Sequence, residues 1–198
     1  MTIKVSYTLG FIRCPETNKV LLLNRNKPPW MGKWNGIGGK LEPNETPVES
    51  MYREAEEETG LDLSNFRSRG VLTWEIAVTN KKDAIYVKHG LNESSMPVTG
   101  GLYLFTADIT KEQFENYRTP LVYNDEGILD WKDLEWITYE FNMGVVDNVK
   151  FIFQHLFDSC EADLFTAKYE NLELVDVQYL PGKNPLCGAP LSNTETIS

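Results

Sequence analysis

The chain has 198 residues, of which 41% are hydrophobic, so its length and composition suit one domain with an apolar core. Its formal net charge is −10. Because the phosphates of a nucleic acid repel an acidic surface, we expect no nucleic-acid partner, and we expect an anionic small molecule to bind only through a divalent cation.

The three cysteines, Cys14, Cys160 and Cys187, are widely spaced and include no CxxC pair. Their odd number predicts neither a disulfide framework nor a zinc site, and it indicates a reducing compartment. The opening residues lack the apolar segment of a signal peptide. No apolar run is long enough to span a bilayer. We therefore expect a cytoplasmic protein with no membrane partner.

The N-terminal part predicts a hairpin followed by a loop. Residues 3–13 and 19–25 are rich in β-forming side chains and flank a turn at 14–18. Residues 26–45 are rich in Gly, Pro, Asn and Trp and predict a structured loop.

The next segment predicts a helix with marked ends. Thr46 suits the N-cap, Pro47 the first turn and Glu49 the third position of a capping box, while Gly60 suits the C-cap. The apolar side chains expected to face the core recur at helical spacing: Val48, Met51, Tyr52, Ala55 and Thr59.

The second half predicts alternating strands and helices. Strands are expected at three places: 66–78, 99–109 and 127–132, the last followed by a turn of helix. Residues 79–98 are polar and predict a hairpin extension or a long loop, whereas 143–158 show helical spacing of apolar residues. Residues 164–170 and 172–180 predict a C-terminal hairpin. The sum is an α+β fold with α/β/α layers, in which helices flank a mixed sheet.

Three carboxylates on the predicted helix carry the chemistry. Glu54, Glu57 and Glu58 have i, i+3 and i+4 spacing, which places them on one helix face. By itself, an acidic run of this kind more often forms a solvent-exposed helix face than a metal site. Clustered hard oxygen ligands, however, suit Mg²⁺ or Mn²⁺.

The surrounding residues extend the acidic run into a longer pattern. The segment reads Gly39, five residues, Glu45, seven residues, then Arg53-Glu54-Ala55-Glu56-Glu57-Glu58-Thr59-Gly60-Leu61. This pattern resembles the Nudix box at every fixed position, although the family tends to have a bulky aliphatic residue where this chain has Ala55.

The resemblance implies the Nudix fold and a hydrolase that directs water at the phosphorus of a nucleoside diphosphate linked to a further group. It implies that Glu54, Glu57 and Glu58 bind the metal ion, with one of them as a candidate base. The carbonyl group of Gly38 is a further candidate ligand. Arg53 and Glu45 are expected to support the site.

Family members often need one more carboxylate before a strand that contains Trp. Glu126, which precedes Trp131, is the candidate metal ligand or base. Asp125 is the alternative candidate. The sequence is also compatible with Glu126 being only a polar residue of a turn.

Base recognition rests on a second resemblance. Asn35 lies in Trp34–Lys40, a loop that looks like the one in MutT-like 8-oxo-dGTP diphosphatases, where the Asn contacts the oxidised purine. Asp147 and Asn148 occupy a place where that subfamily has an acidic or amide residue that reads the base. Loop stabilisation for Asn35 and helix capping for the pair remain the alternatives.

Cations for the phosphates are expected at Arg25, which ends a predicted strand, and at Lys40, with ordinary surface charge as the alternative for each. The sequence markers of ADP-ribose, dinucleoside polyphosphate and NADH hydrolases are absent from the positions where those branches carry them. The resemblance therefore favours a nucleoside triphosphate, cleaved to a nucleoside monophosphate and pyrophosphate, with 8-oxo-dGTP as one candidate. Another nucleoside diphosphate conjugate, or a nucleotide-binding module without turnover, are the alternatives.

The resemblance covers residues 1–158 as the expected hydrolase domain. Residues 159–181 are expected to form a C-terminal extension that packs on the same domain, and 182–198 a flexible tail. Both a monomer and a homodimer are compatible with the sequence.

Overall fold

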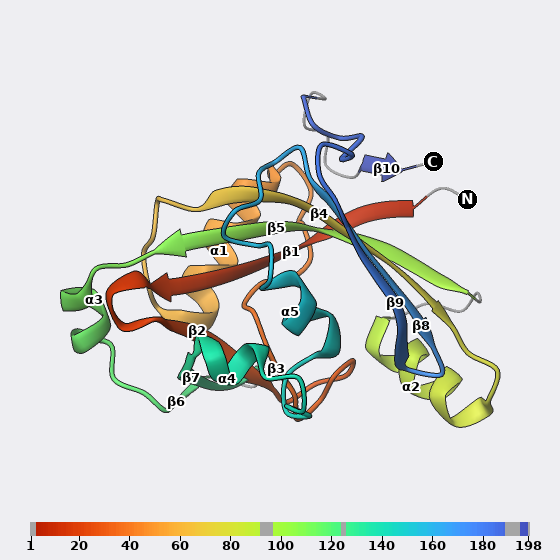
Figure 1. Ribbon diagram of the computed structural model, residues 1–198, viewed down its shortest axis with the longest axis horizontal. Coiled ribbons are helices and arrows are strands. Elements are labelled where there is room, and N and C mark those ends of the chain that lie inside the picture. Colours follow the sequence, from red (N-terminus) through yellow and green to blue (C-terminus); the bar gives the residue numbers. More distant parts are fainter. Residues whose placement is uncertain (1–2, 92–96, 124–125, 189–194, 198) are drawn as a thin grey trace.

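The computed structural model describes residues 3–91, 97–123, 126–188 and 195–197. This part of the chain forms one mixed sheet of ten strands (Figure 1). The strands are β1 (Ile3–Cys14), β2 (Lys19–Arg25), β3 (Trp34–Asn35), β4 (Arg67–Ala77), β5 (Val98–Asp108), β6 (Leu121–Tyr123), β7 (Gly127–Asp133), β8 (Leu164–Glu170), β9 (Glu173–Leu180) and β10 (Glu195–Ile197).

The strands run in the order β6-β7-β2-β1-β5-β4-β8-β9, with β3 paired to β2 and β10 paired to β1. The β1–β5 and β4–β8 pairs are parallel and the other pairs are antiparallel. The helices are α1 (Pro47–Thr59), α2 (Lys81–Leu91), α3 (Lys111–Asn116), α4 (Leu134–Thr138) and α5 (Asp147–Ile152), with a 3₁₀ turn at Pro15–Thr17.

Apolar side chains cover both faces of the sheet. Along β2, Leu21 and Leu23 pack in the cluster that contains Met51 of α1, whereas the alternate residues Val20 and Leu22 pack in the cluster formed with α5. This period of two is the geometry of a strand that is buried on both faces. The helices α1 and α5 therefore lie on opposite faces of the sheet (Figure 1), which confirms the predicted α+β layers.

The helix α1 has the predicted ends. Thr46 accepts a hydrogen bond from the backbone N–H of Glu49, and the Glu49 carboxylate accepts one from the backbone N–H of Thr46, which completes a capping box. Gly60 ends the helix with φ of 71°, a left-handed conformation that glycine adopts without a steric penalty. Of the predicted core residues, Met51, Ala55 and Thr59 are buried.

Two predictions about the second half were wrong. The segment 79–98 was expected to be a hairpin or loop, but it contains the helix α2, whose start is fixed by Asn80 accepting a hydrogen bond from the Asp83 N–H at 2.8 Å. The helix expected over 143–158 is limited to α5. Its last part continues as separate hydrogen-bonded turns that still bury Phe153 and Leu156. Apolar spacing of three to four residues therefore did not distinguish turns from a continuous helix.

The predicted C-terminal hairpin is confirmed as β8 and β9, which extend the sheet beyond β4. Within the tail expected over 182–198, β10 pairs with the start of β1. The domain limits at 158 and 181 remain predictions. Cys14, Cys160 and Cys187 are free thiols. No helix within the described residues is long and apolar enough to cross a membrane.

Replacing Thr46 by Ala removes the side chain that accepts the Glu49 N–H. We expect the free energy of unfolding to fall by about 1 kcal/mol, as measured by urea denaturation. Thr46→Ser is the matched control, because its hydroxyl group keeps the cap. Equal losses in both variants would contradict the capping role.

Candidate active site

Four acidic side chains and two cations line one cleft of about 430 Å³. Its lining residues are Arg25, Lys27, Gly38, Gly39, Glu54, Glu57, Glu58 and Glu126. The helix α1 supplies three of the carboxylates through the i, i+3 and i+4 spacing predicted from the sequence. Residues far apart in the chain thus share one cleft.

Strand pairing brings Glu126 to the cleft. The antiparallel β2–β7 register pairs Arg25 with Gly127, so Glu126 lies just beyond the end of β2. The Asn26 N–H donates to the Glu126 carbonyl at 2.9 Å, and Lys27 forms an ion pair with the Glu126 carboxylate. The alternative residue Asp125 lies outside the described residues.

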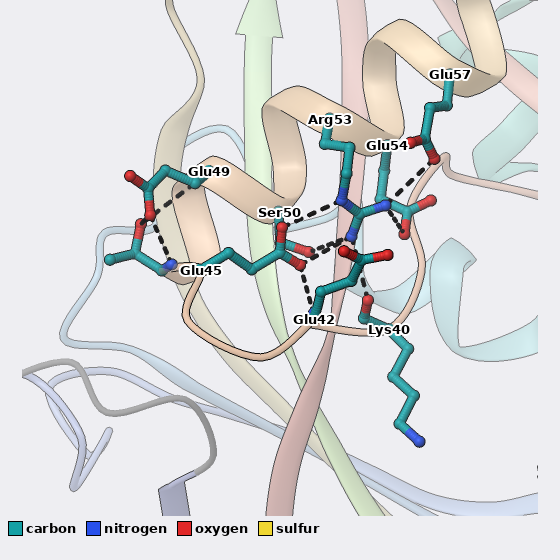
Figure 2. A network of polar contacts seen from close by, with 9 residues as sticks. Lys40, Glu42, Glu45, Glu49, Ser50, Arg53, Glu54 and Glu57 are labelled. Atoms are coloured by element: carbon teal, nitrogen blue, oxygen red, sulfur yellow. Dashed lines mark hydrogen bonds and ion pairs between the residues drawn. The ribbon is translucent and has the colours of Figure 1, made fainter.

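Arg53 is the centre of a network of carboxylates on α1 and the preceding loop (Figure 2). Its guanidinium group donates two hydrogen bonds to Glu45, at 2.8 and 3.1 Å. It also donates to Glu54 at 2.9 Å, to Glu57 at 3.2 Å, and to the Lys40 carbonyl at 3.3 Å. Arg53 therefore ties the loop that carries the glycines to the helix that carries the carboxylates.

The Arg53 hydrogen bonds lower the pKa of Glu45 from 4.5 to about 2. A carboxyl group whose pKa is depressed on folding stabilises the fold above its ordinary pKa, and this contribution is lost as the pH falls toward the folded value. The Glu45–Arg53 pair thus keeps its charge throughout the neutral range.

Glu58 is the most enclosed carboxylate of the cleft, with 7% of its surface exposed. It accepts a hydrogen bond from the Gly38 N–H at 2.9 Å. Burial above all, together with the charges of Glu54 and Glu126, raises the pKa of Glu58 to about 8 against the opposing hydrogen bond from the Gly38 N–H. Burial also raises the pKa of Glu54. In the absence of a cation, burial therefore favours the protonated form of these two most enclosed carboxyl groups.

Two glycines allow the loop to approach the carboxylates and β1. A Cβ atom on Gly39 would lie 2.4 Å from the Glu54 Oε1 atom. Gly38 has φ of +136°, and a Cβ atom there would lie 2.3 Å from the Thr8 carbonyl oxygen. No side chain is tolerated at either position without displacing the backbone or the Glu54 carboxylate.

The chemistry of these donors fits a hard divalent cation, because carboxylate and carbonyl oxygens are the ligands that Mg²⁺ and Mn²⁺ prefer. In the arrangement shown, Arg53 holds Glu54 and Glu57. No three acidic side chains among the described residues converge closely enough to enclose an ion. A cation bound by Glu54 and Glu57 would therefore have to displace Arg53 from them.

A second cavity, of about 210 Å³, adjoins the cleft. Arg25, Gly38 and Gly39 line both spaces. The rest of its lining is largely aromatic and aliphatic, and includes Tyr7, Trp30, Leu72, Trp74, Ile76 and Tyr169. We call this space the aromatic cavity. A charged cleft and a largely apolar cavity thus share one border at Arg25, Gly38 and Gly39.

Two amide side chains also line the aromatic cavity, Asn35 and Asn148. The Asn35 Oδ1 atom accepts a hydrogen bond from the Gly36 N–H at 2.8 Å. This bond engages the oxygen in the loop, as the alternative interpretation of Asn35 expected. The amide nitrogen of Asn35 makes no hydrogen bond within the described ranges, so it is available as a donor.

The sequence of the chain matches the family model described as NUDIX domain over residues 7–153. The chain belongs to the Nudix family. It is 33% identical over 104 residues to an 8-oxo-dGTP diphosphatase of Proteus vulgaris, covering 43% of this chain and 92% of that protein. It is 35% identical over 69 residues to an oxidized purine nucleoside triphosphate hydrolase of Mus musculus, covering 35% of this chain and 43% of that protein.

The fold agrees with this assignment. A MutT protein from Bacillus halodurans superposes with a TM-score of 0.62 at 24% identity, over 87% of this chain and 95% of that one. The predicted resemblance to MutT-like Nudix proteins is therefore confirmed at the level of family and fold.

Two residues predicted to bind substrate in this Nudix protein lie outside the lining of both spaces. Lys40 is exposed and extends away from the Arg53 network (Figure 2). Asp147 forms ion pairs with Lys33 at 3.0 Å and with Lys150 at 3.7 Å. The substrate-binding roles of Lys40 and Asp147 remain predictions. Their neighbours do line the site: Gly39 lines both spaces and Asn148 lines the aromatic cavity.

Sequence reasoning missed Lys27 in the cleft and Tyr169 in the aromatic cavity. Lys27 follows Arg25 by two residues and carries no motif of its own. Tyr169 belongs to β8, beyond the residues that match the family model. No local pattern marks either residue, because Tyr169 reaches the site through strand pairing and Lys27 lies in the irregular loop after β2.

In the metal-free Nudix domain, the raised pKa of Glu58 means that the folded state binds a proton more tightly than the unfolded state. The free energy of unfolding therefore falls as the pH rises from 4.5 toward about 8. We expect Glu58→Gln to raise the melting temperature at pH 8 by about 2–4 °C, roughly 1 kcal/mol, with a smaller effect at pH 5. The measurement is thermal unfolding in the presence of a chelator.

Glu56→Gln is the control for this experiment, because Glu56 is exposed and lies outside the cleft. An equal gain in both variants at both pH values would show that the effect is general charge reduction and not the burial of Glu58.

Proposed function

We propose that this protein is a pyrophosphohydrolase that uses Mg²⁺ or Mn²⁺ to cleave a nucleoside triphosphate into a nucleoside monophosphate and pyrophosphate. The observation that carries the proposal is the continuity of a carboxylate-lined cleft with an aromatic cavity across Arg25, Gly38 and Gly39. A nucleotide has the matching division into a charged chain of phosphates and a flat base.

In this proposal the carboxylates are candidate metal ligands once an ion replaces the Arg53 hydrogen bonds to Glu54 and Glu57. Glu54, Glu57, Glu58 and Glu126 would hold the ion together with the Gly38 carbonyl group, and one carboxylate would serve as the base for the attacking water. Such an ion would neutralise phosphate charge and lower the pKa of water. Arg53 and Glu45 position the helix and the loop.

Two cationic side chains in the cleft allow an acidic protein to bind an anionic substrate. A protein of charge −10 repels an anionic substrate. Arg25 and Lys27 face the same cleft as the carboxylates, so they are placed to contact phosphate oxygens. Phosphoryl transfer depends mainly on such positioning and on electrostatic stabilisation.

The names of the relatives support a purine nucleotide as substrate. Both the Proteus vulgaris and the Mus musculus proteins are named for oxidised purine nucleotides. We propose 8-oxo-dGTP as the first substrate to test, with Asn35 and Asn148 as the amides that contact the base. Asparagine can both donate to and accept from the edge of a base.

The test is release of pyrophosphate from 8-oxo-dGTP, dGTP, the other nucleoside triphosphates and ADP-ribose, with Mg²⁺ or with a chelator. We expect metal-dependent turnover of at least one triphosphate. In the same assay, Glu57→Gln is expected to lower turnover by about a hundredfold or more, because it removes one ligand charge without changing size.

Glu56→Gln is the matched control, with the same change on the same helix outside the cleft. Unchanged turnover in Glu57→Gln would refute the assignment of the cleft. Cleavage of ADP-ribose alone would replace the triphosphate by another nucleoside diphosphate conjugate. Absence of turnover with retained nucleotide binding would indicate a binding module.

Asn35→Ala tests the reading of the base separately from the chemistry. We expect the ratio of kcat/KM for 8-oxo-dGTP over dGTP to fall about three- to tenfold, the worth of one hydrogen bond. The ratio cancels errors in the concentration of active enzyme. An unchanged ratio would leave Asn35 with its structural contact to Gly36 alone.

A further inference from the structure

The C-terminal hairpin contributes one wall of the aromatic cavity. Tyr169 lies on β8, and the parallel β4–β8 register places it beside Ile76, another residue of the cavity lining. The family model ends at residue 153. The hairpin therefore lies outside the residues that match the family model and still reaches the same cavity.

The position of the Tyr169 side chain is fixed from two sides. Its ring lies 5.2 Å from the Trp30 ring, measured between centroids. On α5, the peptide N–H of Asn148 and the charge of Asp147 both affect the pKa of Tyr169. The loop after β2 and the start of α5 thus hold the ring, and only 3% of the residue is exposed.

The Tyr169 hydroxyl group is buried and donates no hydrogen bond in the described part of the chain, since the nearby peptide N–H of Asn148 can only donate to its oxygen. Burial raises its pKa, so the group stays protonated and remains a donor. A buried donor without an acceptor is destabilising, and most such groups in folded proteins have a partner. Its position in the lining of a cavity indicates that the partner belongs to a ligand.

The chemistry of the aromatic cavity limits what that ligand is. Among the described residues that line it, the polar side chains are amides and hydroxyl groups, with Arg25 at the border to the cleft, and none is a carboxylate. Asp147, which is close by, is paired with Lys33 and Lys150. Such a lining suits an uncharged aromatic ring that carries hydrogen-bond acceptors and donors on its edge.

We propose that the hydroxyl group of Tyr169 donates a hydrogen bond to the nucleobase, so that the C-terminal hairpin helps to determine which base this enzyme accepts. This inference rests on the proposed function, because it assigns the aromatic cavity to the base of a nucleotide. It adds a specificity residue on a segment beyond the Nudix match.

The test is Tyr169→Phe, which keeps the ring and its packing on Trp30 but removes the hydroxyl group. We expect KM for the preferred triphosphate to rise about five- to tenfold with kcat nearly unchanged, since the lost bond lies far from the reacting phosphorus. The preference among triphosphates with different bases is expected to fall by a similar factor. Binding of the matching nucleoside monophosphate, measured by calorimetry with a chelator, is expected to weaken in parallel.

Tyr103→Phe is the matched control. Tyr103 is also a buried tyrosine, but it packs in the cluster with α1 on the opposite face of the sheet. Unaltered base preference and monophosphate affinity in Tyr169→Phe, with an active wild-type enzyme, would overturn this inference and leave the proposed function intact. Wild-type enzyme that cleaves no triphosphate would refute the proposed function itself.

Discussion

Repulsion among the carboxylates of α1 is the constraint on which the site depends. Glu54 and Glu58 are largely buried on one helix face, and each gains a raised pKa from its surroundings. Like charges at this spacing destabilise a helix by themselves. Arg53 offsets part of this cost by pairing with Glu54 and Glu57, and it binds Glu45 at the same time.

The same constraint explains the loop before the helix. Arg53 contacts the Lys40 carbonyl group, and the Gly38 N–H contacts Glu58, so the loop is held by the charged groups that it encloses. Side chains at Gly38 and Gly39 would displace Thr8 or Glu54. The sharp loop and the acidic helix thus form one unit in which neither part keeps its geometry alone.

The sheet decides which remote groups join this unit. The pairing of β2 with β7 places Arg25 and Glu126 at one end of the sheet, facing the carboxylates of α1. On the other face, β8 adds Tyr169 to a cavity that α5 and the loop after β2 also line. The charged cleft and the aromatic cavity meet at Gly38 and Gly39 because the loop crosses between the two faces.

The sequence by itself determined the family, the ends of α1 and the spacing of its carboxylates. These features depend on neighbours within a few residues, where the geometry of a helix is fixed by hydrogen bonds between successive turns. The capping box at Thr46 and the shared face of Glu54, Glu57 and Glu58 could be predicted for this reason.

The positions of the other groups relative to this helix follow from the tertiary structure, including that of Glu126, which the sequence offered only as a candidate. It shows Asn148 lining the aromatic cavity and Asp147 in ion pairs with lysines, although the two residues are adjacent and were indistinguishable in sequence. It also places Glu126 and Tyr169, which reach the site through strand register. The alternation of apolar residues determines which face of a strand is buried, but it does not identify which residue of a distant strand lies opposite.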